Sequence, residues 1–102
     1  MDESSITNSH EYEVVTLKGW VLAAKHPAIK KNQYSLFGVC WSHPRFPDGS
    51  SIRTSRILDV SGRYILTHSR TLYYLDDPIP EYIKFLHKHG YIYDPENPII
   101  LE

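Results

Sequence analysis

The sequence predicts an α+β fold, in which a small twisted, mainly antiparallel β-sheet of five or six strands carries one C-terminal helix near residues 79–89. Short runs of β-branched and aromatic residues recur along the chain, separated by Gly, Pro, Asn and Asp. Near the C-terminus, one segment spaces its apolar residues as an amphipathic helix does. The chain has 102 residues, 41% of them hydrophobic and 23% charged, which is typical of one folded domain.

Residues 1–10 are polar and have no apolar periodicity, so we expect a disordered tail before a single β-rich domain over residues 11–102. The N-terminus lacks the basic and apolar regions of a signal peptide, and the longest apolar runs are too short to span a bilayer. We therefore expect a cytoplasmic protein without membrane contact. The single Cys40 lies in an apolar run, where a thiol usually behaves as a small buried hydrophobic group.

The first half of the domain is rich in β-forming residues. Residues 13–17 and 20–24 predict two strands joined tightly at Lys18-Gly19, with a short helix as the alternative for the second segment. Residues 26–33 predict a loop, because a proline interrupts the pattern and polar residues follow it. Residues 34–41 have apolar side chains on both faces and predict a central strand that is buried on two sides. Gly38 in this strand indicates a bulge or a close approach.

The second half begins with a turn-rich loop over residues 43–49, which contains two prolines and an Asp-Gly pair. Residues 52–60 and 63–67 predict a hairpin with its turn at Ser61-Gly62, and residues 71–75 predict a further strand. The apolar residues of the helix then recur at the i, i+3, i+4, i+7 spacing: Ile79, Tyr82, Ile83 and Leu86.

The ends of this helix carry recognisable signals. Pro78 and Pro80 suit a first turn, Asp77 can cap it, and Gly90 can end it. Residues 99–101 can add an edge strand before the sequence ends.

The net charge of −1 conceals a separation of charge along the chain. Residues 1–17 and residues 71–102 each sum to −4, while residues 18–70 sum to +7 with histidines neutral. A basic middle of this kind can bind phosphates or an acidic partner. The alternative is that the acidic ends fold beside the basic middle and neutralise it.

Six histidines are present, but their spacing does not favour a metal site. His87 and His89 lie two residues apart on the predicted helix and point in different directions, and only one cysteine is available. We therefore predict no metal and no cofactor.

The sequence also lacks the common catalytic motifs: the Gly-x-Ser-x-Gly elbow, the Walker loop and the dinucleotide glycine motif. Four residues could act as acid and base in phosphodiester chemistry: His43, His68, Asp48 and Asp59. Both aspartates precede turns, however, and turn formation explains them more simply. We predict that the protein is not an enzyme.

The most informative stretch is residues 43–71, which combines arginines with hydroxyl residues suited to holding anions. The alternative is a solvated strand face in which arginine and threonine alternate with apolar residues. We take the binding site from this stretch: His43, Arg45, Phe46, Arg53, Thr54, Ser55, Arg56, His68 and Arg70.

Three elements over residues 43–75 form a signature: a His-Pro-Arg-Phe-x-Asp-Gly turn from His43, a Thr-Ser pair at Thr54, and a Thr-x-Ser-x-x-x-Tyr-x-Leu strand from Thr67. About a third of the chain carries it, and in these residues the sequence resembles an uncharacterised class of small proteins from bacteria, prophages and phages. The resemblance implies a mobile-element setting, in which small proteins often inhibit host defence by masking a protein surface, as anti-CRISPR proteins do.

We therefore expect a small non-catalytic, protein-binding inhibitor or adaptor whose partner is a host or phage protein. Tyrosine, tryptophan and arginine, which are abundant in the sequence, dominate the energetics of protein interfaces. The alternative is a protein that binds nucleic acid or a small anionic nucleotide through the central arginines.

Overall fold

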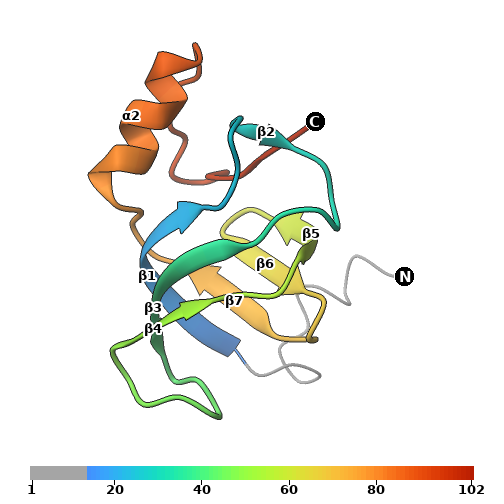
Figure 1. Cartoon of the computed structure of the whole chain (residues 1–102), viewed down its shortest axis with the longest axis vertical. Helices are drawn as coiled ribbons and strands as arrows, with labels where there is room; N and C mark the ends of the chain where they lie inside the picture. The colour runs from blue at the N-terminus through green and yellow to red at the C-terminus, as the bar shows by residue number, and fades with distance from the viewer. Residues whose placement is uncertain (1–13) are drawn as a thin grey trace.

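The computed structural model describes residues 14–102, so the tail predicted over residues 1–10 lies outside the described part. The elements, in chain order, are β1 (Val14–Leu22), β2 (Ala28–Ile29), β3 (Leu36–Trp41), β4 (Ser50–Arg53), β5 (Ile57–Ser61), β6 (Tyr64–Thr67), β7 (Leu72–Leu75), α2 (Pro80–Lys88) and β8 (Ile100–Leu101). A six-stranded sheet has the order β4-β3-β1-β7-β6-β5 (Figure 1). Its pairs are antiparallel except β1 with β7, so the predicted α+β fold with one C-terminal helix is confirmed.

A second, two-stranded sheet joins β2 to β8 in parallel. The predicted strand at residues 99–101 is therefore present, although it pairs outside the main sheet. Its partner lies within residues 26–33, where the sequence predicts only a loop. That prediction missed Ala28–Ile29 because so short a strand is defined by its distant partner rather than by a local pattern.

The two strands expected over residues 13–24 are one strand, β1. Its register with β3 shifts between Lys18 and Val21, so Gly19 and Trp20 form an irregularity opposite Gly38. Gly19 has a φ of 54°, which glycine adopts readily and which lets the strand continue through the bend instead of reversing. The backbone of this bend also bonds the chain that leads to α2, because the Gly19 N–H donates to the Asp77 carbonyl and the Ile79 N–H donates to the Trp20 carbonyl.

The strand predicted over residues 52–60 is interrupted. β4 ends at Arg53 and β5 begins at Ile57, and the residues between them leave the ladder. Thr54 N–H donates to the Leu36 carbonyl and Ile57 N–H donates to the Tyr34 carbonyl, so the chain bends around the start of β3. The hairpin itself forms, but Ser61 pairs with Tyr64, which places the turn at Gly62-Arg63 rather than at Ser61-Gly62. Gly62 has a φ of 59° in this turn.

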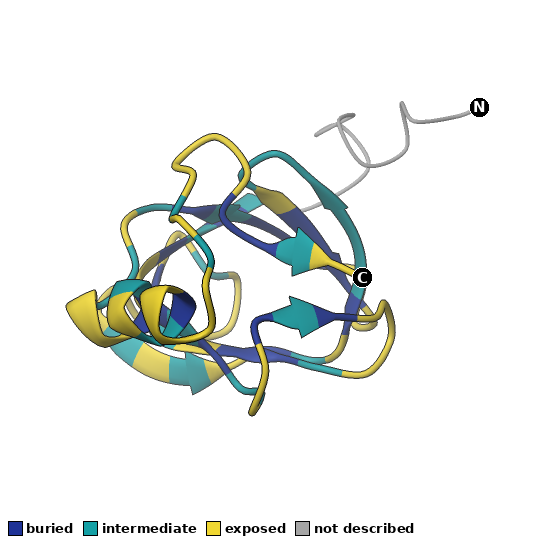
Figure 2. Cartoon of the chain, turned by 90° about the horizontal axis from the view of Figure 1, so that it is seen from above, coloured by how far each residue is buried: buried dark blue, intermediate teal, exposed yellow. Residues whose placement is uncertain are grey.

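The strand β3 is covered on one face only, which corrects the prediction of a strand buried on two sides. Leu36 and Cys40 are fully buried, whereas Phe37 and Trp41 on the opposite face are 43% and 37% exposed. One face of β3 is buried and the other is exposed because helix α2, β2, β8 and the C-terminal segment all pack on the core side (Figure 2). The buried thiol expected at Cys40 is confirmed.

Helix α2 closes the core at one end of the sheet (Figure 1). Tyr82 and Leu86 are its buried residues, and the Tyr82 ring lies 4.7 Å from the Trp20 ring between centroids. The Tyr82 hydroxyl donates to the Pro98 carbonyl at 2.7 Å, which holds the C-terminal segment against the helix. The position of the helix is as predicted, but its N-cap residue is Ile79 and no side chain caps it, so the role assigned to Asp77 is wrong.

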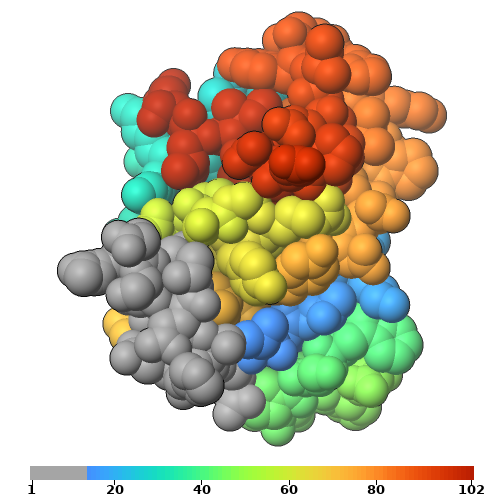
Figure 3. All heavy atoms as spheres, turned by 180° about the vertical axis from the view of Figure 1, so that it is seen from behind, coloured from blue at the N-terminus to red at the C-terminus, as the bar shows by residue number. Residues whose placement is uncertain are grey.

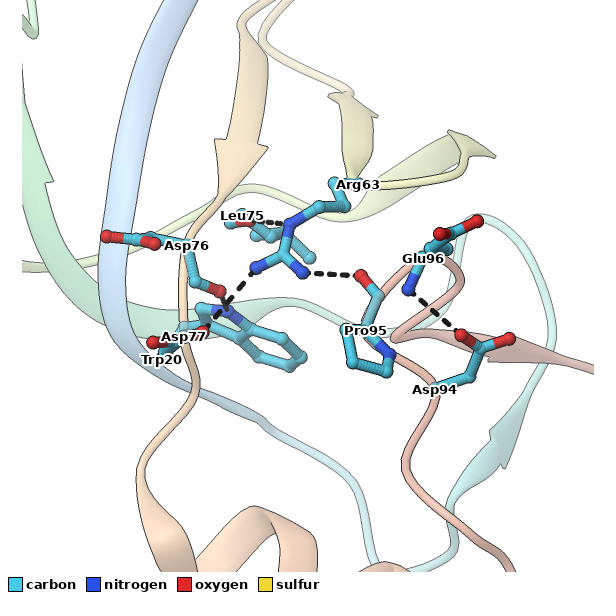
Figure 4. Close-up of polar contacts among 8 residues, drawn as sticks. All are labelled: Trp20, Arg63, Leu75, Asp76, Asp77, Asp94, Pro95 and Glu96. Atoms are coloured by element: carbon cyan, nitrogen blue, oxygen red, sulfur yellow. Dashed lines mark hydrogen bonds and ion pairs between the residues drawn. The ribbon is translucent and has the colours of Figure 1, made fainter.

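The C-terminal segment lies across the β5–β6 hairpin beside the helix (Figure 3). Arg63 at the hairpin turn connects these parts: its Nε donates to the Leu75 carbonyl at 2.7 Å, one Nη donates to the Pro95 carbonyl, and the other lies 3.9 Å from Asp77 (Figure 4). Arg63 is thus a structural residue. Within residues 14–102, no helix is long and apolar enough to cross a membrane.

Candidate functional site

The loop between β3 and β4 holds one group of the predicted site residues. The ring centroids of His43 and Phe46 lie 4.7 Å apart, and Arg45 lies over the Phe46 ring with its Cζ 5.9 Å from the centroid. The His43 Nδ1 accepts a hydrogen bond from the Arg45 N–H at 3.0 Å. Burial, and then the charge of Arg45, lower the pKa of His43, which favours the neutral ring that this hydrogen bond requires.

This loop is fixed by its own contacts. The Asp48 carboxylate accepts the Ser42 N–H at 2.8 Å, and no ion pair joins Asp48 to Arg45 in the described part of the chain. Asp48 therefore acts as a turn former, as the sequence suggests. Arg45 and Phe46 are both exposed at the tip of the loop.

A second group of predicted site residues lies where the β4–β5 connection meets the β6–β7 turn. Ser55 Oγ donates to Ser69 Oγ at 3.1 Å and accepts the Ser69 N–H at 2.9 Å, and the Arg56 carbonyl accepts the His68 N–H. The Arg56, His68 and Arg70 side chains are exposed around this contact. Tertiary structure thus brings Ser55, Arg56, His68 and Arg70 together, although they come from two separate segments.

Thr54 has a structural position between these groups. Its side chain is buried, and its Oγ1 accepts the Leu36 N–H at 3.0 Å and donates to the Ser55 carbonyl at 2.8 Å. These bonds complete the ladder where β4 leaves β3. Thr54 consequently offers no free hydroxyl to a ligand.

Arg53 belongs to neither group and lies on the exposed side of β4. Its Nε donates to Ser35 Oγ at 2.9 Å, and its Cζ lies 5.1 Å from the centroid of the Phe37 ring. The side chain therefore folds back across β3 rather than extending from the edge of the sheet.

The solvent-facing side of β1, β3 and β4 forms a continuous surface, which we call the open face. The register places Val21, Phe37 and Arg53 in one row across the strands, and Lys18, Val39 and Ser51 in the next. Trp41 follows beyond Val39, and the Lys18 Nζ lies 5.1 Å from its ring centroid. The members of the open face are Lys18, Val21, Phe37, Val39, Trp41, Ser51 and Arg53.

A shallow apolar hollow of about 410 Å³ lies on this open face. Its floor includes the glycine backbone of the β1 irregularity and of the strand opposite, where no side chain rises from the sheet. The residues that line it are Gly19, Val21, Phe37, Gly38, Val39, Ser51, Ile52 and Arg53.

The open face is positively charged. The strands β1, β3 and β4 contain Lys18 and Arg53 and no acidic residue. Elsewhere, three basic residues of the middle of the chain are paired with acids: Arg63 with Asp77, Lys30 with Glu102 and Lys31 with Asp59. Among residues 14–102, neither Lys18 nor Arg53 takes part in an ion pair, so their charge remains available to a partner.

Of the members of this face, sequence reasoning named only Arg53, and it missed Lys18, Phe37 and Trp41 among the others. It assigned the aromatic residues to a doubly buried strand and Lys18 to a tight connection. The strand period does place Phe37, Val39 and Trp41 on one face and Leu36 and Cys40 on the other, but both faces are apolar, so the sequence does not indicate which of them is exposed.

The candidate acid–base residues do not form a catalytic arrangement in the described part of the chain. No hydrogen bond or ion pair there joins His43 or His68 to Asp48 or Asp59, and Asp59 instead contacts Lys31 at 2.8 Å. Within the same residues, no three His, Cys, Asp or Glu side chains gather as ligands of a metal ion.

No protein-family model matches the chain, and no curated protein or solved structure matches it significantly. The resemblance to small proteins of phages and prophages therefore stays a prediction.

Proposed function

We propose that this protein is a small non-catalytic binding protein, an inhibitor or adaptor, that attaches to an acidic surface of a protein partner through the open face. One observation carries the proposal. Phe37 and Trp41 are exposed on the same face of β3, one on either side of Val39, and the strands β1, β3 and β4 bear two cations and no acid.

Exposed aromatic residues beside cations are suited to a protein interface. Large aromatic side chains supply most of the binding energy of many interfaces, and cations at their margin select an acidic partner. Phe37 and Trp41 are held in place by the sheet, so little conformational entropy is lost when they are covered. The loop group of Arg45 and Phe46 lies at one end of the same β3–β4 hairpin and could extend the contact.

An inhibitor that masks a partner, as the sequence resemblance implies, needs a rigid surface of this kind rather than a deep pocket. The hollow is shallow and is lined by Phe37, one of the two exposed aromatic residues, which suits a protruding partner side chain. The finer identification, a phage protein that blocks a host defence protein, rests on that resemblance alone.

Site-specific photo-crosslinking tests this proposal. A photoreactive phenylalanine analogue replaces Trp41, and the same analogue replaces Ile92 as the matched control, because Ile92 is 86% exposed but lies outside the open face. The full chain is expressed in cells of the organism that encodes it and irradiated. We expect Trp41→analogue to crosslink to a specific protein that Ile92→analogue does not capture.

Crosslinks to the same proteins from both positions would contradict the proposal, because they would indicate contact without a preferred surface. Nuclease-sensitive crosslinks from position 41 would instead support the second candidate function, binding of single-stranded nucleic acid. That alternative is favoured by the aromatic residues and cations on an open sheet, the elements of a stacking platform.

Two observations favour the protein partner. A stacked base needs an uncovered ring face, whereas Lys18 and Arg53 already lie over Trp41 and Phe37. The net charge of −1 also provides little long-range attraction for a polyanion. Titration at increasing salt separates the two, because binding to phosphates weakens steeply with ionic strength.

A further inference from the structure

The two edges of the six-stranded sheet differ in how they are covered. At β5, the Asn32 N–H donates to the Ile57 carbonyl and the Ile57 N–H donates to the Tyr34 carbonyl, so the loop between β2 and β3 covers part of that edge. At β4, no hydrogen bond to a residue outside the β3–β4 ladder is made by the backbone of Ser51, Ile52 or Arg53 within residues 14–102.

The pairing of β4 with β3 determines which backbone groups are free. Thr54 N–H bonds the Leu36 carbonyl, and alternate residues of an antiparallel strand point their backbone groups the same way. Ile52 therefore directs its N–H and carbonyl toward β3, whereas Ser51 and Arg53 direct theirs outward. Exposed edges of this kind are commonly protected by an extended charged side chain, but Arg53 folds back over Phe37 and leaves the edge accessible.

We propose that β4 is a strand-addition site, at which an extended, acidic segment of the partner pairs with Ser51 and Arg53 and places an apolar side chain in the adjoining hollow. In strand addition, backbone hydrogen bonds supply affinity and adjacent pockets select alternate side chains. Ser51 and Arg53 both line the hollow, so the added strand would lie beside it. The positive charge of Arg53 and Lys18 and the absence of acids on these strands select an acidic segment.

This inference rests on the proposed function and is tested separately from it. The probe is a displayed library of random linear peptides, selected on the immobilised full chain. We expect enrichment of acidic sequences with alternating apolar residues. In the complex, the amides of Ser51 and Arg53 should exchange with solvent more slowly by about tenfold or more, while Ile52, already bonded to β3, changes little.

The matched variants are Ser51→Pro and Ser51→Ala. Proline removes the outward N–H without removing a bond to β3, and it is tolerated at edge positions of this kind. Ser51→Pro should weaken binding of the selected peptide by about tenfold or more, and Ser51→Ala should not. The exchange measurement needs no substitution, so it decides the question even if Ser51→Pro fails to fold.

A selected peptide could require Trp41 for binding and yet leave the Ser51 and Arg53 amides unprotected from exchange. That result would refute strand addition but would still support the open face as the binding surface. Two results together would overturn both the protein-binding function and the strand-addition site. No peptide would be enriched, and a single-stranded oligonucleotide would bind with a steep dependence on salt. Protection of the two amides at high protein concentration without peptide would assign the edge to a second copy of this chain and overturn the peptide site.

Discussion

Gly38 lies directly against Leu17 across the β1–β3 pair: a Cβ atom at Gly38 would lie 2.7 Å from Leu17 Cγ and 3.1 Å from Trp20 Cβ. Both neighbours are fully buried, so neither can move toward solvent. The same glycine forms part of the floor of the hollow, which couples the packing of the core to the shape of the open face.

Gly38→Ala is therefore expected to destabilise the protein by about 1–3 kcal/mol, the usual cost of overpacking a core. The measurement is the free energy of unfolding in urea. Ser51→Ala, on the exposed side of the neighbouring strand, is the control and should change stability by less than about 0.5 kcal/mol. Equal, small effects of both substitutions would mean that Leu17 does not crowd Gly38.

Leu86→Ala is expected to cost about 2–5 kcal/mol, because Leu86 is 1% exposed and its truncation leaves a cavity beneath α2. Lys84→Ala, on the exposed side of the same helix, should be nearly neutral. Denaturant unfolding of both variants checks this. A cost below about 0.5 kcal/mol for Leu86→Ala would show that Leu86 does not face the core, which would contradict the orientation of the helix.

The helix could be predicted from the sequence because its signals are local. Tyr82 and Leu86 lie on one stripe of a single segment, and Gly90 ends it with a φ of 87°. The segments of the main sheet were located for the same reason, through short β-forming runs between turn residues, although β2 was missed and the breaks within residues 13–24 and 52–60 were misplaced. For β3, the sequence could not show which face is buried, because Phe37 and Trp41 are as apolar as the buried residues of the strand. Their exposure depends on whether other elements cover one face of the sheet or both.

The candidate site was partly predictable for similar reasons. The prolines and Asp-Gly pair marked the rigid loop that presents Arg45 and Phe46. The contact between Ser55 and Ser69 depends on the distant turn of β6 and β7, and the cation–aromatic pair of Lys18 and Trp41 depends on the β1–β3 register. Neither arises from a pattern within one segment.

Arg63→Lys is expected to destabilise the protein by about 1–3 kcal/mol, although it keeps the charge. Only the guanidinium can bond the Leu75 and Pro95 carbonyls while facing Asp77, and its side chain is 19% exposed. Thermal unfolding of Arg63→Lys and of an Arg56→Lys control measures this. If the two variants unfold at the same temperature, Arg63 does not connect the hairpin to the C-terminal segment.

Stability is expected to fall in alkali because of Tyr82. Burial, and then the nearby Tyr93, raise the pKa of the Tyr82 hydroxyl above its value of about 10 in an unfolded chain. The folded state therefore holds the proton more tightly. The stability contributed by this group is complete below pH 10 or so and is lost as pH rises further.

The free energy of unfolding against pH, measured for the natural chain and for Tyr82→Phe, tests this assignment. Tyr82→Phe should be less stable at neutral pH, since it lacks the hydrogen bond to the Pro98 carbonyl, and should lose less stability above pH 10 or so. An unchanged alkaline slope would assign the effect to other groups.

The most direct test of the central claim is the affinity of the crosslinked partner for the double variant Phe37→Ala/Trp41→Ala, measured by calorimetry against Ile92→Ala. Both variants should remain folded by circular dichroism, because the residues removed are exposed. If the open face is the binding surface, the double variant binds about a hundredfold more weakly, as expected for two interface hot spots, and Ile92→Ala binds normally. Unchanged affinity of the folded double variant would contradict the account.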